Sequence, residues 1–286
     1  PCKARKDRER QPHFSGNAAT HIFGIIRMSG LVDKIVSRLF KTNSRQPHPL
    51  DPDEESIRQS VVGYMELIGR YIPYFQLLSD AEKLRFVART WHFRQSKSFH
   101  FLNMEEQADI PILLSAAAVQ ITFGLTRYKL PFFKKIYVMP DAYLYQEKAP
   151  PYIGHVSSKG IFISWKHFLQ GYADSTDNVN VAIHEMAHAL SYDNFVDVTG
   201  VDWEFRQDFA KFPTLFGPAI ADLIVNKRCY LRPYAYTNLQ EFWAVSVEAF
   251  FENPIGLKDN MPRLYAVIVE ILNQDLQARH RINTAI

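Results

Sequence analysis

The sequence has few of the features that mark secreted or membrane proteins. Its two cysteines, Cys2 and Cys229, are too few for a disulfide framework and have no metal-ligand spacing. No apolar run reaches the roughly 20 residues that span a bilayer, because charged residues such as Glu66 and Arg70 interrupt the longer stretches. The N-terminus also lacks the apolar core of a signal peptide. We therefore expect a cytoplasmic protein that uses neither disulfide bridges nor a membrane.

A strong charge imbalance is also missing. The net charge is only +3, and the one dense basic run, Lys3–Arg10, lies in a terminal tail. A tail of this kind is more often solvated than bound to a partner, so we expect no direct contact with nucleic acid. The chain begins with Pro, and Met28 is the first candidate start, with residues 1–27 as a leader or an added extension.

The pattern of apolar residues predicts an α+β protein that is mainly helical. Residues 1–54 are expected to form an N-terminal extension and linker, and residues 55–286 a single domain. Carboxylates at 53–55 and the Ser79–Glu82 capping pattern predict two helix starts, and Ile110–Leu125 predicts a buried helix. Short runs then predict the strands of a small sheet, after which the chain is expected to stay mainly helical to Asp275; the runs are Lys134–Met139, Tyr143–Gln146 and Gly160–Trp165.

The segment from His184 to His188 reads His-Glu-Met-Ala-His. On a helix, residues four apart project from one face, so both imidazoles can reach one Zn²⁺ at about 2.0–2.1 Å. Glu185 then lies beside the metal, where it can accept a proton from the attacking water as a general base. This pattern predicts a zinc-dependent peptidase.

Apolar residues surround this segment from Val179 to Leu190. Burying two histidines and a glutamate among them without partners would cost several kcal/mol, and a metal with its surrounding hydrogen bonds removes that cost. The alternative interpretation is a satisfied pair of core histidines that binds no metal.

A catalytic zinc needs a third protein ligand, and spacing alone leaves two candidates. Glu241 and Glu248 are seven residues apart on one face of a predicted apolar helix. Glu241 also fits the third position after a helix cap at Asn238, which would give it a purely structural role. Glu248, among apolar neighbours, is either a ligand or a residue that orients a histidine.

Two further groups are candidates for contact with substrate. Tyr234 and Tyr236 lie just ahead of this helix, and either can donate a hydrogen bond to an oxyanion, although most tyrosines only pack. His155 lies before an expected edge strand and can contact substrate, although a surface histidine without a function is the commoner case. An extended peptide can pair with the edge strand expected near Phe162–Ser164.

Between Leu78 and Asp275 the chain resembles the Mlc titration factor A family of zinc peptidases, a group of gluzincins also likened to the catalytic domain of anthrax lethal factor. The segments that carry the resemblance are LSDAEKLRF, FGL, YVMPDAY, GIFISW, NVNVAIHEMAHAL and PYAYTNLQEFWAVSVEAFFENP. The last is the most specific, because it follows the family pattern of Tyr-Ala, a Glu seven residues after the Tyr, and Glu-x-Phe-Phe.

The resemblance implies a zincin-like fold, with Glu241 as the third zinc ligand beside His184 and His188, and with Tyr234 as the catalytic tyrosine. The family usually has Asp three residues after the second His, where this chain has Ser191. Asp193, two residues further on, is then a candidate to orient His188, as Glu248 is for either histidine.

The leading hypothesis is a peptidase that binds one zinc per chain and acts on peptides or proteins. Aminopeptidase activity is one form that this hypothesis includes. The alternative is a regulatory binding protein, because the family is named for sequestering a glucose-responsive transcriptional repressor. In that case the partner is a transcriptional regulator and catalysis is secondary.

Overall fold

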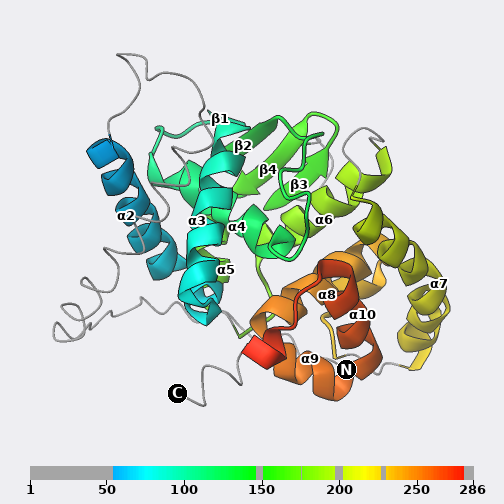
Figure 1. Cartoon of the computed structure of the whole chain (residues 1–286). Helices are drawn as coiled ribbons and strands as arrows, with labels where there is room; N and C mark the ends of the chain where they lie inside the picture. The colour runs from blue at the N-terminus through cyan, green and yellow to red at the C-terminus, as the bar shows by residue number, and fades with distance from the viewer. Residues whose placement is uncertain (1–53, 146–150, 175, 197–201, 227–229, 280–286) are drawn as a thin grey trace.

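A computed structural model describes residues 54–145, 151–174, 176–196, 202–226 and 230–279 (Figure 1). The first of these residues, Glu54, begins helix α2 (Glu54–Tyr71), as the carboxylates at 53–55 predict. The rest of the predicted N-terminal extension and linker lies outside the described residues.

The first helices form one side of the core. Helix α2 buries Met65 and Ile68, and the 3-10 helix η2 (Pro73–Leu77) leads into α3 (Asp80–Gln95). Ser79 caps α3: its backbone N–H and its hydroxyl both donate to the Glu82 carboxylate, at 3.0 and 2.8 Å. The predicted capping pattern is confirmed.

Helix α4 (Asp109–Thr122) is the buried helix that the small-residue run predicts. It packs against both α3 and α6 (Val181–Val196), and almost all of its side chains are buried. Small residues at 115–118 allow this close approach, because they leave room for neighbours on several faces. The helix therefore ties the N-terminal helices to the helix that carries the two histidines.

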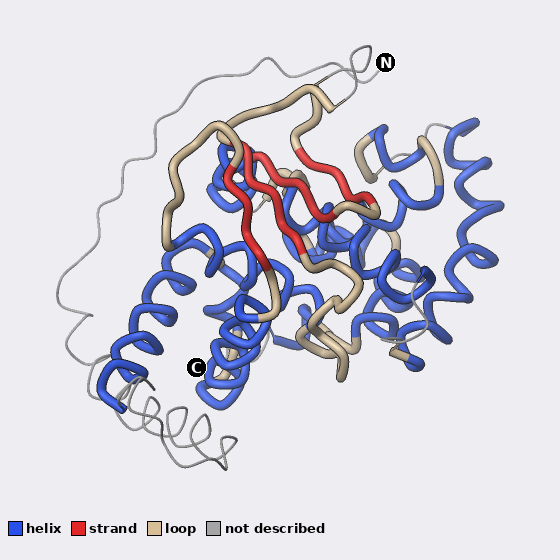
Figure 2. The backbone as a smooth tube through the Cα atoms, turned by 90° about the horizontal axis from the view of Figure 1, so that it is seen from above, coloured by secondary structure: helices blue, strands red, loops and turns tan. Residues whose placement is uncertain are grey.

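The sheet has four strands in the order β1 (Ser98–Phe101), β2 (Lys135–Met139), β4 (Gly160–Ser164), β3 (Gly154–Ser157). Strands β1, β2 and β4 run parallel, and β3 is antiparallel to β4. The sheet lies above most of the helices in Figure 1, and the view from above in Figure 2 looks across its strands onto the helices behind them. Alternate residues such as Ile136, Val138, Ile161 and Ile163 are fully buried in the core.

The strands correct two expectations. Strands β1 and β3 were not predicted. Of the predicted strand Tyr143–Gln146 the structure describes the first three residues, and among these only Tyr143 pairs, through a single bridge to Tyr152. The prediction of an edge near Phe162–Ser164 is wrong, because β4 lies between β2 and β3. The antiparallel strand that covers this edge is β3, so β3 itself is the free edge of the described sheet.

Helix α5 (Trp165–Ala173), which begins at the last residue of the predicted strand Gly160–Trp165, was not predicted. After Asn178 the described chain is mainly helical, as predicted, and consists of α6, α7 (Trp203–Asn226), η3 (Pro233–Tyr236), α8 (Leu239–Glu252), α9 (Pro254–Asn260) and α10 (Pro262–Leu272). Helix α6 packs against β3 and β4 on one side and α8 on another. The Trp243 indole N–H of α8 donates to the Ala187 carbonyl of α6 at 3.0 Å, which fixes the two helices relative to each other. The fold is α+β and zincin-like, as predicted.

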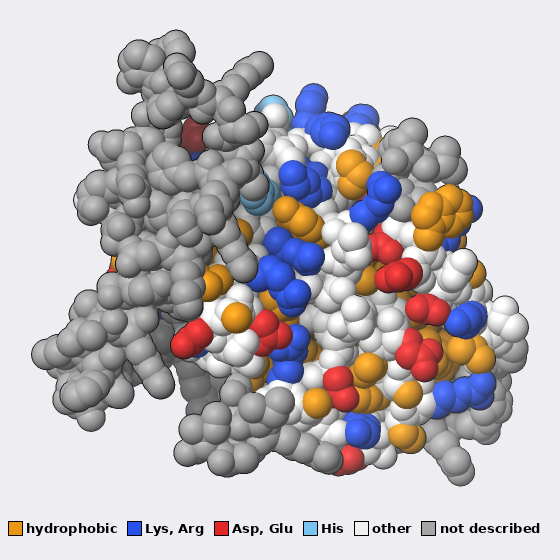
Figure 3. Space-filling view, viewed as in Figure 1, with side chains coloured by type: hydrophobic (Ala, Val, Ile, Leu, Met, Phe, Trp, Pro, Cys, Tyr) orange, Lys and Arg blue, Asp and Glu red, His pale blue; other side chains and the backbone are white. Residues whose placement is uncertain are grey.

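The outer surface carries both signs of charge. On the face seen in Figure 3, Lys and Arg side chains form a strip near the middle, and Asp and Glu side chains lie mainly to its right and below. Hydrophobic side chains occur among them in small groups, as on most soluble surfaces. Within the described part of the chain, no helix has both the length and the apolar character that a membrane span requires.

Candidate metal centre

Helix α6 carries His184 and His188 one turn apart, facing α8. The side chain of His184 is nearly buried, with 8% of the residue exposed, and the His188 ring lies edge-on to it at 4.7 Å between centroids. The helix is apolar on its other faces, where it packs against α4, α5 and the sheet. Its position in the core therefore holds both imidazoles rigidly.

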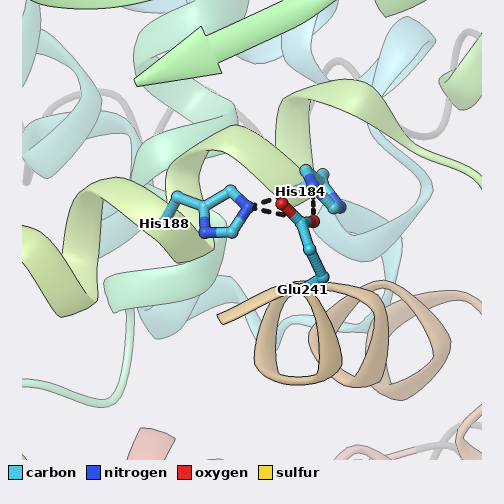
Figure 4. Close-up of side chains that lie close together, drawn as sticks. All are labelled: His184, His188 and Glu241. Carbon is cyan, nitrogen blue, oxygen red and sulfur yellow. Dashed lines mark hydrogen bonds and ion pairs between the residues drawn. The ribbon is translucent and has the colours of Figure 1, made fainter. Parts of the chain in front are cut away.

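Helix α8 brings Glu241 to the same place. The Asn238 side chain caps α8 by accepting a hydrogen bond from the Glu241 backbone N–H at 2.9 Å. The cap uses only the backbone of Glu241, and its carboxylate points to the histidines (Figure 4). The structural role considered from the sequence is thus present, but it does not occupy the side chain.

The three side chains present one donor atom each to a common point. The two Nε2 atoms lie 3.1 Å apart, and Oε2 of Glu241 lies 3.1 Å from Nε2 of His184 and 3.4 Å from Nε2 of His188. Donors at about 2.0–2.1 Å from a tetrahedral ion are separated by about 3.3 Å. The spacing of the donors therefore fits one small tetrahedral cation.

A buried carboxylate sets the tautomer of His184. Oε1 of Glu248, which is fully buried, lies 2.7 Å from Nδ1 of His184, so the ring hydrogen belongs on Nδ1. In the neutral ring this leaves the Nε2 lone pair pointing at Glu241 and His188. A proton or a metal cation between these lone pairs and the carboxylate would satisfy all of them. The donor set thus fits a metal ion.

Charge in the site supports the same conclusion. Burial opposes a charged imidazole at His184, but the hydrogen bonds that its ring donates to the Glu241 and Glu248 carboxylates outweigh burial and raise its pKa to about 10. Burial likewise opposes ionisation of Glu241, but the two histidines lower the pKa of its carboxyl well below the usual range. The site is therefore built to stabilise positive charge at its centre.

Glu185 lies beside the three donors on α6, with 5% of the residue exposed. Burial raises the pKa of its carboxyl to about 7, a value that suits a group exchanging protons near neutral pH. Strand β3 passes directly over it: a Cβ atom at Gly154 would lie 2.7 Å from both Cγ and Oε1 of Glu185. Only glycine leaves room for the carboxylate here, and this contact was not predicted.

Two more groups hold Glu248. It accepts a hydrogen bond from the Asn180 backbone N–H at 2.7 Å, and the Arg232 guanidinium pairs with its Oε1. Arg232 also lies over the Tyr234 ring, 5.4 Å from its centroid, so it links the η3 segment to the histidines. Arg232 was not predicted, and the only available indication was that a buried Glu248 needs a cationic partner.

The two candidate tyrosines lie in different surroundings. Tyr234 is 48% exposed and lies with its ring 5.9 Å from the His184 ring, whereas Tyr236 is half-buried and packs on Phe242. Burial, together with the Glu241 carboxylate, raises the pKa of Tyr234 to about 12, so its hydroxyl keeps its proton at neutral pH. Tyr234 therefore lies beside the three candidate metal-ligand side chains with a hydroxyl that can donate a hydrogen bond.

The remaining candidates lie further away. His155 lies on strand β3 rather than in a loop before β4, with its ring stacked on Phe162 and Nδ1 at 2.7 Å from the Tyr143 hydroxyl. Asp193 is buried on α6, where its carboxylate accepts a hydrogen bond from the Phe132 backbone N–H at 2.7 Å. That contact anchors the segment after α4 and does not involve His188.

A cleft of about 730 Å³ opens over the donors. Its lining includes the two histidines, Glu185, Tyr234 and Glu241, together with Gly154, His155 and Val156 of β3. A volume of this size suits a bound small molecule or a peptide segment. The arrangement places a cation site, a carboxylate that can exchange a proton and a hydroxyl donor in one open cleft.

A family model described as glucose-regulated metallo-peptidase M90 matches residues 57–272, which is 216 of the 286 residues. The chain belongs to this family. The resemblance to the Mlc titration factor A family is confirmed by this match and by the relatives described next. M90 family membership implies a metal cofactor, and the His184, His188 and Glu241 cluster is a group of side chains that can hold it.

The relatives of this M90 chain are distant but cover most of its length. It is 27% identical to Mlc titration factor A of Pectobacterium atrosepticum over 73% of this chain and 85% of that protein. Mlc titration factor A of Edwardsiella ictaluri is 24% identical over 71% of this chain and 85% of its own length. A protein of Synechocystis sp. described as uncharacterized is 26% identical over 78% of this chain and 88% of its own length.

Proposed function

We propose that this chain is a zinc-dependent peptidase in which His184, His188 and Glu241 hold the metal. The observation that carries the proposal is the convergence of their three donor atoms, 3.1–3.4 Å apart, next to Glu185 in an open cleft. Two imidazoles and one carboxylate are a common ligand set of catalytic zinc. Zinc bound there supplies Lewis-acid chemistry, lowering the pKa of water and polarising a carbonyl oxygen.

The chain's own residues carry the proton and the charge. Glu185 accepts a proton as water attacks the peptide carbonyl and delivers it to the departing amine. The Tyr234 hydroxyl donates a hydrogen bond to the oxyanion of the tetrahedral intermediate. Glu248 keeps the His184 ring in the tautomer whose Nε2 faces the metal site, and Arg232 holds Glu248 in place.

The substrate is a peptide or protein segment in extended conformation. Strand β3 (Gly154–Ser157) has one edge paired with β4 and lines the cleft with the other. A peptide that adds to this free edge by backbone hydrogen bonds passes over the donors. The resemblance also implies aminopeptidase-type cleavage, and peptides with free and acetylated N-termini distinguish that activity from endopeptidase activity.

The test compares wild type with Glu185→Gln, and the control is the exposed Glu270→Gln on α10. We expect about one zinc per chain in all three proteins by elemental analysis. Glu185→Gln should lose peptidase activity by about 10²–10⁴-fold, the usual contribution of a general base. Cleavage by Glu185→Gln at the wild-type rate would remove Glu185 from the mechanism.

A second candidate function is binding to a transcriptional regulator, and the names of the relatives favour it. Proteins named Mlc titration factor A match over most of this chain. The test is capture of proteins from the native lysate by wild type and by His184→Ala, which should bind no zinc. Equal capture of a stoichiometric regulator by both proteins would support binding that does not depend on the metal.

A further inference from the structure

The face of α6 that carries the histidines continues past them. Ser191, Tyr192 and Phe195 follow His188 by three, four and seven residues, so they lie on the same helical face. All three line the same cleft as His184 and His188. The cleft therefore extends from the candidate metal site along α6 towards its C-terminal end.

Two other helices close this end of the cleft. Helix α7 contributes Phe209, Ala210 and Pro213, and α8 contributes Leu239, Gln240 and Trp243. We call these six residues, with Ser191, Tyr192 and Phe195, the three-helix pocket. Its aromatic rings pack on one another: Phe209 lies 5.4 Å from Phe195 and 4.8 Å from Trp243 between ring centroids.

The three-helix pocket contains no charged side chain among the residues that are described. The acidic and histidine side chains of the cleft lining are instead at the metal-site end, namely His184, Glu185, His188 and Glu241, or on β3, namely His155. The guanidinium of Arg206 lies 5.7 Å from the centre of the Phe195 ring, and Arg206 is not among the lining residues. A charged ligand group would lose water here without gaining a counter-ion.

Phe195 is 43% exposed even though it lies within an aromatic cluster. An exposed aromatic ring in a concave site gains free energy when an apolar ligand group covers it. The three-helix pocket adjoins the candidate metal ligands. A peptide bound over these ligands places the side chain next to its scissile bond in the pocket, so that side chain is the apolar group.

We propose that the three-helix pocket binds a bulky uncharged side chain, aliphatic or aromatic, of the substrate residue that flanks the scissile bond. This inference rests on the proposed peptidase function and adds its substrate class. Peptides with Leu or Phe at that position are bound and cleaved in preference to peptides with Asp, Glu, Lys or Arg.

The first test measures binding without turnover. Zinc-loaded Glu185→Gln is titrated calorimetrically with acetylated peptides that differ only at one position, which is Leu, Phe, Asp or Lys. Each of two positions flanking the central bond is varied in turn. At one of them, the Leu and Phe peptides should bind at least about tenfold more tightly than the Asp and Lys peptides. Equal binding of all four peptides at both positions would overturn the proposal.

The second test reverses the preference with one charge. Ala210 is exposed on α7 and lines the pocket, so Ala210→Asp, made in the Glu185→Gln background, places a carboxylate there with little risk to folding. We expect the affinity for the Lys peptide relative to the Leu peptide to rise at least about tenfold. The matched control is Thr214→Asp, which adds the same charge at an exposed position of α7 outside the lining. It should leave the ratio unchanged, and an equal change in both variants would assign the effect to general charge.

Turnover separates this inference from the proposed function. The wild type is incubated with the same peptides, and the products are identified by mass spectrometry. Selective binding without cleavage of any peptide would overturn the peptidase function and keep the pocket as a binding site for apolar side chains. Cleavage without preference at either position would keep the peptidase and overturn the proposed substrate class.

Discussion

Nδ1 of His184 lies 2.7 Å from Oε1 of Glu248, which joins the first turn of α6 to the C-terminal half of α8 through two side chains. Glu248 is fully buried, and its other oxygen accepts the backbone N–H of Asn180, the residue just before α6. One carboxylate thus orients a histidine ring and anchors the start of the helix that carries it. The ring orientation is therefore held by contacts within the protein itself.

The first prediction concerns this contact. Glu248→Gln keeps the size of the side chain but replaces the acceptor at one oxygen by an amide. We expect the zinc affinity to fall by about 10–100-fold, as is typical when the partner of a ligating histidine is changed. Competition with a chromophoric chelator measures it, with Glu270→Gln as the control. An unchanged affinity would show that Glu248 does not orient His184.

The second prediction separates the two roles of Glu241. Asn238→Ala removes the cap of α8 and should lower the free energy of unfolding by about 0.5–2 kcal/mol, while zinc still binds. Glu241→Gln keeps the capped backbone N–H, so it should retain most of the stability and lose much of the zinc affinity. Urea unfolding and zinc titration of both variants check this. Strong zinc binding by Glu241→Gln would contradict the ligand role.

The third prediction concerns the tyrosines of the η3 segment. Tyr234→Phe removes the hydroxyl beside the donors and should lower kcat by about 10²–10³-fold, as loss of an oxyanion donor does. Zinc content should stay the same, because the hydroxyl is not one of the three donors. The control is Tyr236→Phe, which keeps the ring that packs on Phe242 and should keep kcat within about twofold. Equal effects of both variants would contradict the role of Tyr234.

The sequence predicted the central helices of this protein better than the short strands of its sheet. Helix α6 and the buried α4 are long and strongly apolar, and the Ser79 cap has a local pattern, so each was recognisable by itself. Strand β1 is four residues long and pairs with β2, which begins 34 residues after β1 ends (135 − 101). A short parallel strand has no local partner in the sequence to reveal it.

The same reasoning explains the error at the edge of the sheet. Strand β3 begins with Gly154 and has only four residues, a weak strand signal, whereas β4 is apolar throughout and was taken for the edge. Glu241 could not be separated from Glu248 by spacing, because both lie on one face of α8. Which of them faces Nε2 of His184 and which faces Nδ1 depends on how α8 crosses α6, and this is a tertiary property.

The fourth prediction tests the closeness of β3 to Glu185. Gly154→Ala adds a Cβ atom that would lie 2.7 Å from the Glu185 carboxylate, so the strand or the carboxylate must shift. Kcat should fall at least about tenfold, because a small misplacement of a catalytic group has a large effect on rate. Zinc affinity should change little, because Glu185 is not a donor.

Gly63→Ala on α2 is the matched control for Gly154→Ala. No atom lies within 4 Å of the Cβ position there, and alanine favours a helix by about 0.5–1 kcal/mol over glycine. It should therefore keep its activity and gain a little stability. A Gly154→Ala protein as active as this control would show that Glu185 tolerates a side chain on β3.

The fifth prediction concerns Glu252 at the end of α8, which is buried near other carboxylates. Burial raises the pKa of its carboxyl to about 8, the Asn180 side chain opposes the rise, and Asp177 and Glu248 add to it. Because the native pKa lies above the unfolded value of 4.5, the native state binds more protons between pH 4.5 and about 8. The stability that the neutral carboxyl provides is therefore lost as the pH rises through this window.

Glu252→Gln removes the titration and keeps the shape of the side chain. Its free energy of unfolding relative to wild type should rise by roughly 1–2 kcal/mol between pH 5 and pH 8. Urea unfolding at several pH values measures this, with zinc removed by a chelator in both proteins so that metal binding does not contribute. Glu66→Gln, at an exposed position of α2, should show no such trend relative to wild type. A constant difference between Glu252→Gln and wild type would mean that Glu252 is ionised in the native protein across this range, and that its neighbours, not its burial, determine its charge.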